Sequence, residues 1–141
     1  MSELNEPARI LALREESGHH IDFSRRARRW LDEFARSSNL AIDYINNTRD
    51  IDDAFLEHYN LVLQLDYPPY GWFDRAATAF EKYIAEGRGG WVGLHHAALL
   101  GEFDGFPMWQ WFSDLLGGIR YANYIPDFAR DRKSTRLNSS H

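Results

Sequence analysis

Short apolar runs of strand length alternate along this chain with stretches in which apolar side chains recur every three or four residues. The apolar runs occupy residues 9–14, 40–45, 61–65 and 89–98. The helical spacing occurs in residues 27–34, 51–58, 73–84 and 108–116. The connections are long enough for crossover helices, so the pattern predicts an α/β fold in which helices cover a parallel sheet with right-handed crossovers.

Polar side chains follow three of the predicted strands, at the point where each strand ends. In a parallel sheet these ends meet at one edge, where open α/β sheets place their ligand sites. The side chains expected there are His19 and His20 after the first strand, Asp66 and Tyr70 after the third, and His95, His96 and Glu102 at and after the end of the fourth. We therefore expect a polar ligand site at this edge. Trp72 and Trp109 would either stack on the ligand or pack in the core.

The chemistry of this histidine-rich edge has three interpretations. Neutral imidazoles and carboxylates bind zinc and similar divalent ions, in which case His19, His20, His95 and Glu102 would be the ligands. The same groups can act as general acids and bases near neutral pH. Histidines at strand ends can also simply hydrogen-bond to the backbone. Adjacent residues of a strand point to opposite faces, so His95 and His96 are not expected to share one ligand unless the chain turns between them.

Composition narrows the functional classes. The 141 residues suffice for one domain, and there is no cysteine, which excludes disulfides, thiolate nucleophiles and cysteine-bound zinc. The net charge of −5 argues against a nucleic-acid partner. No apolar run reaches membrane-spanning length and the polar N-terminus lacks the character of a signal peptide, so we expect no membrane partner and a cytoplasmic location. No glycine motif for nucleotide binding follows a strand.

The last part of the chain, residues 130–141, differs from the rest. It has no periodicity and no apolar face, and it resembles translated sequencing-adapter read-through. A genuine basic tail is the alternative. We expect one domain over residues 1–129, followed by a non-native disordered tail over residues 130–141. On this interpretation the native sequence continues differently, and the chain is a fragment.

The segment around the fourth predicted strand resembles a known family. A helical stretch leads to a glycine-rich turn, then to the run Gly93-Leu94-His95-His96-Ala97, and later to a tryptophan and the double glycine at residues 117–118. This order of motifs resembles the ThuA-like (trehalose utilisation) domain. The resemblance extends from residue 9 to about residue 128 and is most specific over residues 87–98.

The resemblance implies a flavodoxin-like, three-layer fold similar to that of class I glutamine amidotransferases, here incomplete at its C-terminal end. It also implies a sugar-like ligand, such as trehalose or a related keto-glycoside. In the amidotransferases a cysteine nucleophile follows the equivalent strand, and His95 stands at that position here. Because the chain has no cysteine, we expect no glutamine hydrolysis.

Taken together, these observations assign roles to the edge residues. The expected catalytic residues are His95, His19 and His20. The expected ligand-binding residues are His96, Asp66, Tyr70, Trp72, Glu102 and Trp109. The alternative is a non-catalytic α/β module for binding or assembly. The later strands of the family are missing from this chain, which would leave the fourth strand as an exposed edge able to pair with a second copy.

Overall fold

The computed structural model describes residues 6–16, 18–102 and 105–121, and its sheet has four parallel strands in the order β2-β1-β3-β4. The strands are β1 (Ala8–Arg14), β2 (Leu40–Ile45), β3 (Leu61–Leu65) and β4 (Gly90–Leu94). The α-helices are α1 (Ile21–Ser38), α2 (Asp53–Leu56), α3 (Asp74–Ala85) and α4 (Gln110–Leu115). Two 3₁₀ helices, η2 (Pro69–Gly71) and η3 (His95–Ala98), follow β3 and β4. This arrangement confirms the predicted α/β, flavodoxin-like fold.

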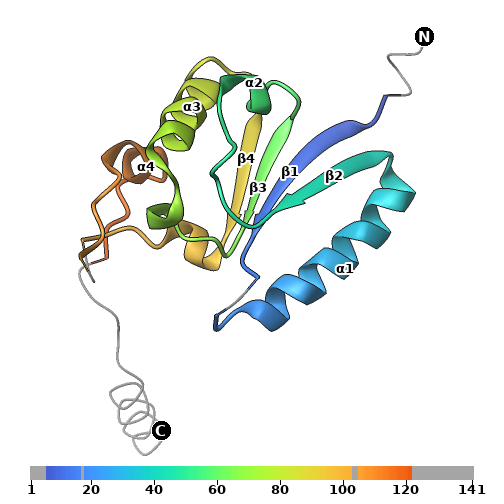
Figure 1. Cartoon of the computed structure of the whole chain (residues 1–141), viewed down its shortest axis with the longest axis horizontal. Coiled ribbons are helices and arrows are strands. Elements are labelled where there is room, and N and C mark those ends of the chain that lie inside the picture. The colour runs from blue at the N-terminus through green and yellow to red at the C-terminus, as the bar shows by residue number, and fades with distance from the viewer. Residues whose placement is uncertain (1–5, 17, 103–104, 122–141) are drawn as a thin grey trace, which may run out of the picture.

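The sheet lies between two helical layers, with α1 on one face and α2, α3 and α4 on the other (Figure 1). The face toward α1 carries a small aliphatic core: Ile10, Ala12, Leu31, Leu63 and Leu65. The opposite face carries a larger core, in which Leu11, Leu13 and Val62 lie with aromatic side chains of α3 and α4. Because both faces of β1 are buried, this strand is apolar along its whole central part rather than alternating with polar residues.

The inward face of α1 differs from the predicted one. Leu31 is buried as expected, but Trp30 is 60% exposed and Phe34 is 42% exposed. These two rings stack on each other at a centroid distance of 5.0 Å instead of entering the core. Ser24 is fully buried and bonds to Arg14 of β1, so the helix is rotated toward a partly polar face. Apolar spacing alone did not reveal this rotation.

The fourth strand is shorter than predicted. It ends at Leu94, and residues 95–98 form η3 instead of continuing the strand. His95 adopts a left-handed backbone with φ of 54°, which ends the extended conformation. The chain therefore turns at His95, which is the condition under which the sequence allowed His95 and His96 to share one ligand.

Strand β4 has a neighbour on one side only within the described residues. Val92 and Leu94 pair with Leu63 and Leu65 and thus share the face that α1 covers elsewhere, yet they are 45% and 40% exposed. The exposed edge agrees with the sequence-based expectation, and pairing with a second copy stays a prediction.

Glycines with a left-handed backbone end α3 and α4. Gly87 follows the last turn of α3 with φ of 67°, and Gly117 and Gly118 follow α4 with φ of 89° and 91°. This left-handed backbone is one that glycine adopts without steric cost, so it ends a helix readily. Across the described ranges, none of the helices combines the length and the hydropathy needed to cross a membrane.

Candidate functional site

The loops that follow β1, β3 and β4 meet at the carboxyl edge of the sheet and bring together three histidines and one aspartate. His20 precedes the first turn of α1, Asp66 directly follows β3, and His95 and His96 open η3. One potential ligand atom from each of these four residues lies within 4.8 Å of the others. We call this set, His20, Asp66, His95 and His96, the histidine cluster.

The three imidazole rings of the histidine cluster contact one another directly. His95 and His96 stack with a centroid distance of 4.3 Å and an interplanar angle of 17°. The ring of His20 stands nearly perpendicular to both, at centroid distances of 5.1 Å from His95 and 4.3 Å from His96. His95 is exposed to solvent, whereas His20 and His96 are half-buried. A ligand arriving from solvent would therefore meet His95 first.

Asp66 is the most deeply buried member of the histidine cluster, with only 1% of its surface exposed. Its Oδ1 accepts a hydrogen bond from the backbone N–H of His96 at 3.1 Å. Its Oδ2 lies 3.2 Å from Nδ1 of His20 but has no partner with hydrogen-bond geometry. A short distance with poor alignment is a weak hydrogen bond, so this contact contributes little to satisfying the carboxylate. The carboxylate thus keeps an unsatisfied oxygen directed at the histidines.

The backbone at the histidine cluster is held in an uncommon conformation at two points. Asp66 has φ of 60° and His95 has φ of 54°, and neither is a glycine. The backbone N–H of Asp66 donates to the carbonyl of Leu94 at 3.2 Å, which ties the two turns together. Non-glycine residues in this region cost roughly 1–3 kcal/mol each and are concentrated at functional sites.

Electrostatics favours neutral imidazole at the inner part of the histidine cluster. Burial lowers the pKa of His96, and the neighbouring histidines act in the same direction, although the Asp66 charge opposes them. Burial and the charge of Asp66 raise the pKa of Glu15, which lies on the loop after β1. A neutral imidazole can accept a proton or donate an electron pair, so His96 is available for either role near neutral pH.

Two of the four residues predicted as metal ligands lie outside the histidine cluster. His19 is exposed and is not among the four residues whose ligand atoms converge. Glu102 is also exposed and pairs with Arg120 at 3.0 Å. The four side chains whose donor atoms converge thus include Asp66 and His96, where the sequence predicted His19 and Glu102, and metal binding by either set stays a prediction. Glu102 sits in a loop whose course the apolar pattern does not specify.

The aromatic residues expected to bind ligand are placed in different ways. Trp72 is 7% exposed and packs between Phe80 and Trp109 at centroid distances of 4.9 and 5.6 Å, so the structure favours the core role for this side chain. Trp109 is half-buried, and its indole N–H donates to Glu81 at 3.1 Å. Tyr70 stacks on Phe106 with a centroid distance of 4.0 Å. Ligand stacking is thus least compatible with Trp72.

Two buried polar residues that support the sheet edge were not identified from the sequence. Gln64 is fully buried; its amide N–H donates to the carbonyl of Tyr67, and its amide oxygen accepts from the indole of Trp91 at 3.0 Å. It thereby joins β3, β4 and the loop that carries Asp66. Thr48 is also fully buried, and its hydroxyl oxygen accepts from the backbone N–H of Phe73 at 2.9 Å. The available signal for Gln64 was one polar residue within an otherwise apolar strand.

Replacing Thr48 by valine tests the link between the loop after β2 and the start of α3. Valine keeps the shape but removes the acceptor, so the partly buried hydrogen bond from the N–H of Phe73 would be lost. We expect the free energy of unfolding to fall by about 1–3 kcal/mol in urea denaturation. Thr48→Ser keeps the hydroxyl and should lose less. Equal losses for the two variants would show that the hydroxyl does not carry this contribution.

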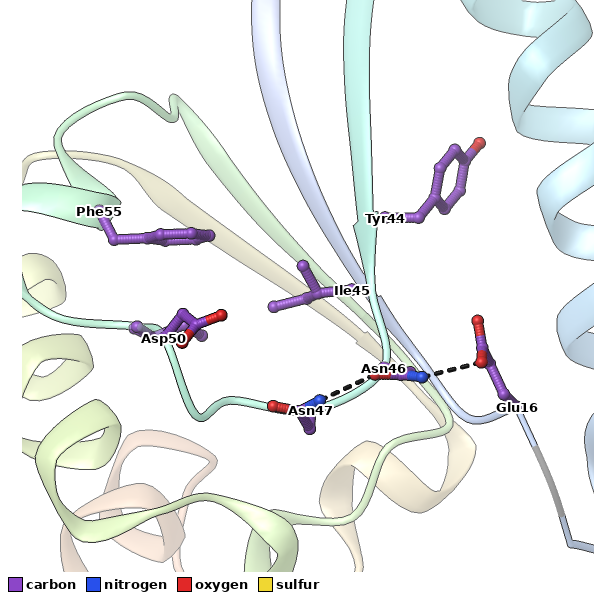
Figure 2. Close-up of a pocket in the computed structure, with 8 residues that line it drawn as sticks. Glu16, Tyr44, Ile45, Asn46, Asn47, Asp50 and Phe55 are labelled. Atoms are coloured by element: carbon purple, nitrogen blue, oxygen red, sulfur yellow. Dashed lines mark hydrogen bonds between the residues drawn. The ribbon is translucent and has the colours of Figure 1, made fainter.

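A polar pocket of about 280 Å³ lies at the same edge of the sheet, at the end of β2 (Figure 2). Asn46 donates a hydrogen bond to Glu16 at 2.8 Å, and Asn47 donates to Asn46 at 2.8 Å. Ile45 points toward Phe55, while Tyr44 points toward α1 (Figure 2). The full lining is Glu16, Tyr44, Ile45, Asn46, Asn47, Asp50, Ile51 and Phe55. The volume is just below the range of about 300–1,000 Å³ for small-molecule sites.

Comparisons with known proteins agree with this architecture. A search among curated proteins finds no match. The crystal structure of a ThuA-like protein from Bacteroides uniformis ATCC 8492 is similar, with a TM-score of 0.68 and 27% sequence identity; the match covers 86% of this chain and 48% of that one. The chain therefore spans about half the length of that relative.

The family comparison covers nearly the whole sequence. The model of the ThuA family, described as trehalose utilisation, matches residues 9–140. The match runs past residue 129, where we expect the native domain to end. Residues 130–141 lie outside the described part of the structure, and the foreign tail stays a prediction. With a matching family model and a structural neighbour of the same kind, the chain belongs to the ThuA (trehalose utilisation) family.

Proposed function

We propose that this ThuA-family chain binds a carbohydrate of the trehalose or keto-glycoside class at the carboxyl edge of its sheet and that the histidine cluster acts on it. The observation that carries the proposal is the convergence of His20, His95 and His96 over the buried Asp66. The family description supplies the ligand class. The location proposed for the protein is the cytoplasm.

The lining of the pocket at the end of β2 supports a sugar ligand. Carboxylate and amide groups from Glu16, Asn46 and Asp50 can exchange hydrogen bonds with ring hydroxyls. The rings of Tyr44 and Phe55 offer apolar surface for the C–H groups of a pyranose. Glu16 lies on the loop that leads to His20, so a sugar in this pocket would approach the histidine cluster from the β1 side.

The proposed chemistry is proton transfer. His95 is the most accessible of the three imidazoles and contacts the ligand. His20, whose Nδ1 lies 3.2 Å from Oδ2 of Asp66, serves as the partner of His95 in acid–base work. In a keto sugar, the carbon next to the carbonyl is the acidic position from which a base removes a proton. Glutamine hydrolysis through a thioester is outside this proposal, because the chain contains no cysteine nucleophile.

Ligand-detected NMR with trehalose, a 3-keto disaccharide and, as a non-sugar control, inositol tests the proposal. We expect at least one of the two sugars to bind, and we expect His95→Ala to weaken binding or conversion by about 100-fold or more, a typical effect of losing an acid–base group. The matched control is His58→Ala, because His58 is an exposed histidine that precedes β3, at the opposite end of that strand from Asp66.

The outcomes of this experiment are distinct. If neither sugar binds, or if His95→Ala and His58→Ala behave alike, the proposed site is wrong. Binding without any conversion would identify a non-catalytic binding module, the alternative that the sequence analysis kept open.

A further inference from the structure

We propose that His20, Asp66, His95 and His96 together bind one divalent transition-metal ion of the zinc class. This inference deepens the proposed function, since it concerns the same edge of the sheet and rests on the proposed function for the position of the sugar. The metal itself can be tested without any sugar. The ligand set differs from the one expected from the sequence, which contained His19 and Glu102.

The distances among the four donor atoms are close to those required around one metal ion. Zinc bonds to nitrogen and oxygen are about 2.0–2.1 Å long, so neighbouring ligands of a tetrahedral ion lie about 3.3 Å apart. The Nδ1 of His20 and the Oδ2 of Asp66 are already 3.2 Å apart. All four donors lie within 4.8 Å of one another, so no pair has to approach by more than about 1.5 Å to reach that spacing. Side-chain rotation alone can provide such a movement.

The buried carboxylate of Asp66 provides the second, independent argument. It is 99% removed from solvent, and its Oδ2 has no hydrogen bond. An uncompensated buried carboxylate is costly, and a bound cation removes that cost. Arg14, the buried arginine of β1, forms its ion pair with Glu16 and donates another hydrogen bond to Ser24, while its Nε has no partner; among the described residues the ion pair recorded for Asp66 is the one with His20.

The remaining contacts of the histidine cluster orient its donor atoms, as hydrogen bonds to metal ligands do in known metal sites. The Oδ1 of Asp66 accepts from the His96 N–H, which leaves Oδ2 directed toward the rings. The left-handed backbone at Asp66 and His95 turns both side chains to the same point, at the cost of local strain. Bonds to a metal would offset that strain in the loaded protein.

The chemical nature of the donors selects the ion class. Three imidazoles and one carboxylate suit zinc and neighbouring transition metals, whereas magnesium and calcium prefer oxygen donors throughout. A bound ion of this class would polarise a carbonyl or hydroxyl oxygen of the sugar once one coordination position opened to it. Imidazole nitrogens that hold the ion do not also transfer protons, so in the metal-loaded protein this polarisation would take the place of the acid–base roles given above to His20 and His95. His95, as the exposed member, is the ligand best placed to yield that position.

The test is zinc titration of chelator-treated protein, followed by competition against a chromogenic chelator and by cobalt substitution. We expect one zinc per chain and a cobalt complex with the intense visible absorption of tetrahedral coordination. Loss of an outer-sphere partner already weakens metal affinity about 10–100-fold, so Asp66→Asn and His96→Ala should each weaken zinc binding by more than about 100-fold. His58→Ala is the matched control and should bind zinc as the parent protein does.

Circular dichroism and thermal unfolding show whether each variant is folded. If Asp66→Asn or His96→Ala does not fold, zinc binding is measured on His20→Gln in its place. Zinc that binds with the same strength to all variants, or no zinc at stoichiometric concentration, overturns the inference. Sugar binding is measured on both chelator-treated and zinc-loaded protein. Zinc binding without sugar binding in either state overturns the proposed function alone, while sugar binding by a protein that takes up no zinc overturns the metal site alone.

Discussion

Replacing Phe80 by alanine is expected to lower the free energy of unfolding by about 3–5 kcal/mol, the range observed when a buried phenylalanine is truncated. Phe80 is completely buried in α3, at the centre of the larger core. Its ring lies 4.9 Å from the centroid of Trp72, 5.9 Å from that of Trp111 and 6.2 Å from that of Phe112. These rings are held by other neighbours as well, so they cannot collapse fully into the cavity, and the loss includes a cavity contribution.

Urea denaturation of the parent and the variant measures this loss. The matched control is Phe73→Ala, because Phe73 directly precedes α3 and is 49% exposed, and its loss should be below about 1 kcal/mol. Similar losses for the two variants would contradict the view that Phe80 anchors α3 and α4 to the sheet. The result also concerns the site indirectly, since Trp72 closes the loop that begins at Asp66.

Replacing Gly89 by alanine is expected to cost about 3 kcal/mol, the upper part of the usual range for overpacking. An added Cβ would lie 1.7 Å from the Tyr83 hydroxyl oxygen and 2.7 Å from the backbone carbonyl oxygen of Asn60. Neither atom can move freely. The Tyr83 hydroxyl donates to the carbonyl of Tyr59 at 3.0 Å, and the Asn60 carbonyl accepts from the N–H of Gly90 at 3.0 Å. The start of β4 would therefore be displaced from β3.

The neighbouring glycine provides the control for this substitution. At Gly90 an added Cβ would contact only the end of the Leu61 side chain, at 3.4 Å, so Gly90→Ala should be nearly neutral. Thermal and urea unfolding of the two variants measure the difference. If Gly89→Ala is as stable as Gly90→Ala, the close approach of β4 to its neighbours is not required. Because β4 leads directly to His95 and His96, a displaced strand would also disturb the histidine cluster.

Much of the sheet could be predicted because apolar runs and their spacing report directly on burial. The predicted runs at residues 9–14, 40–45 and 61–65 correspond to β1, β2 and β3 almost residue for residue. The fourth run was read four residues too long, since alanines and histidines after Leu94 do not break an apolar pattern. Only the backbone angle at His95 ends the strand, and composition does not encode that angle.

The candidate site could be predicted in location and only partly in membership. Parallel topology requires the loops after β1, β3 and β4 to meet, so the encounter of His20, Asp66 and His95 followed from the order of elements. Glu102 was expected there too, but it pairs with Arg120 on the surface. The sequence allowed His96 to join His95 only if the chain turned between them, and the turn into η3 brings the two rings into contact.

The sequence by itself determined the α/β class, the order of helices and strands along the chain, and the edge of the sheet at which polar side chains gather. These properties follow from the spacing of apolar residues, which can be read in each segment of the sequence without knowledge of the others. Only the tertiary structure decided which donors converge on Asp66 and which oxygen of that carboxylate remains unsatisfied. Those properties depend on single backbone angles and on contacts between segments far apart in the chain, and no local pattern of residues specifies them.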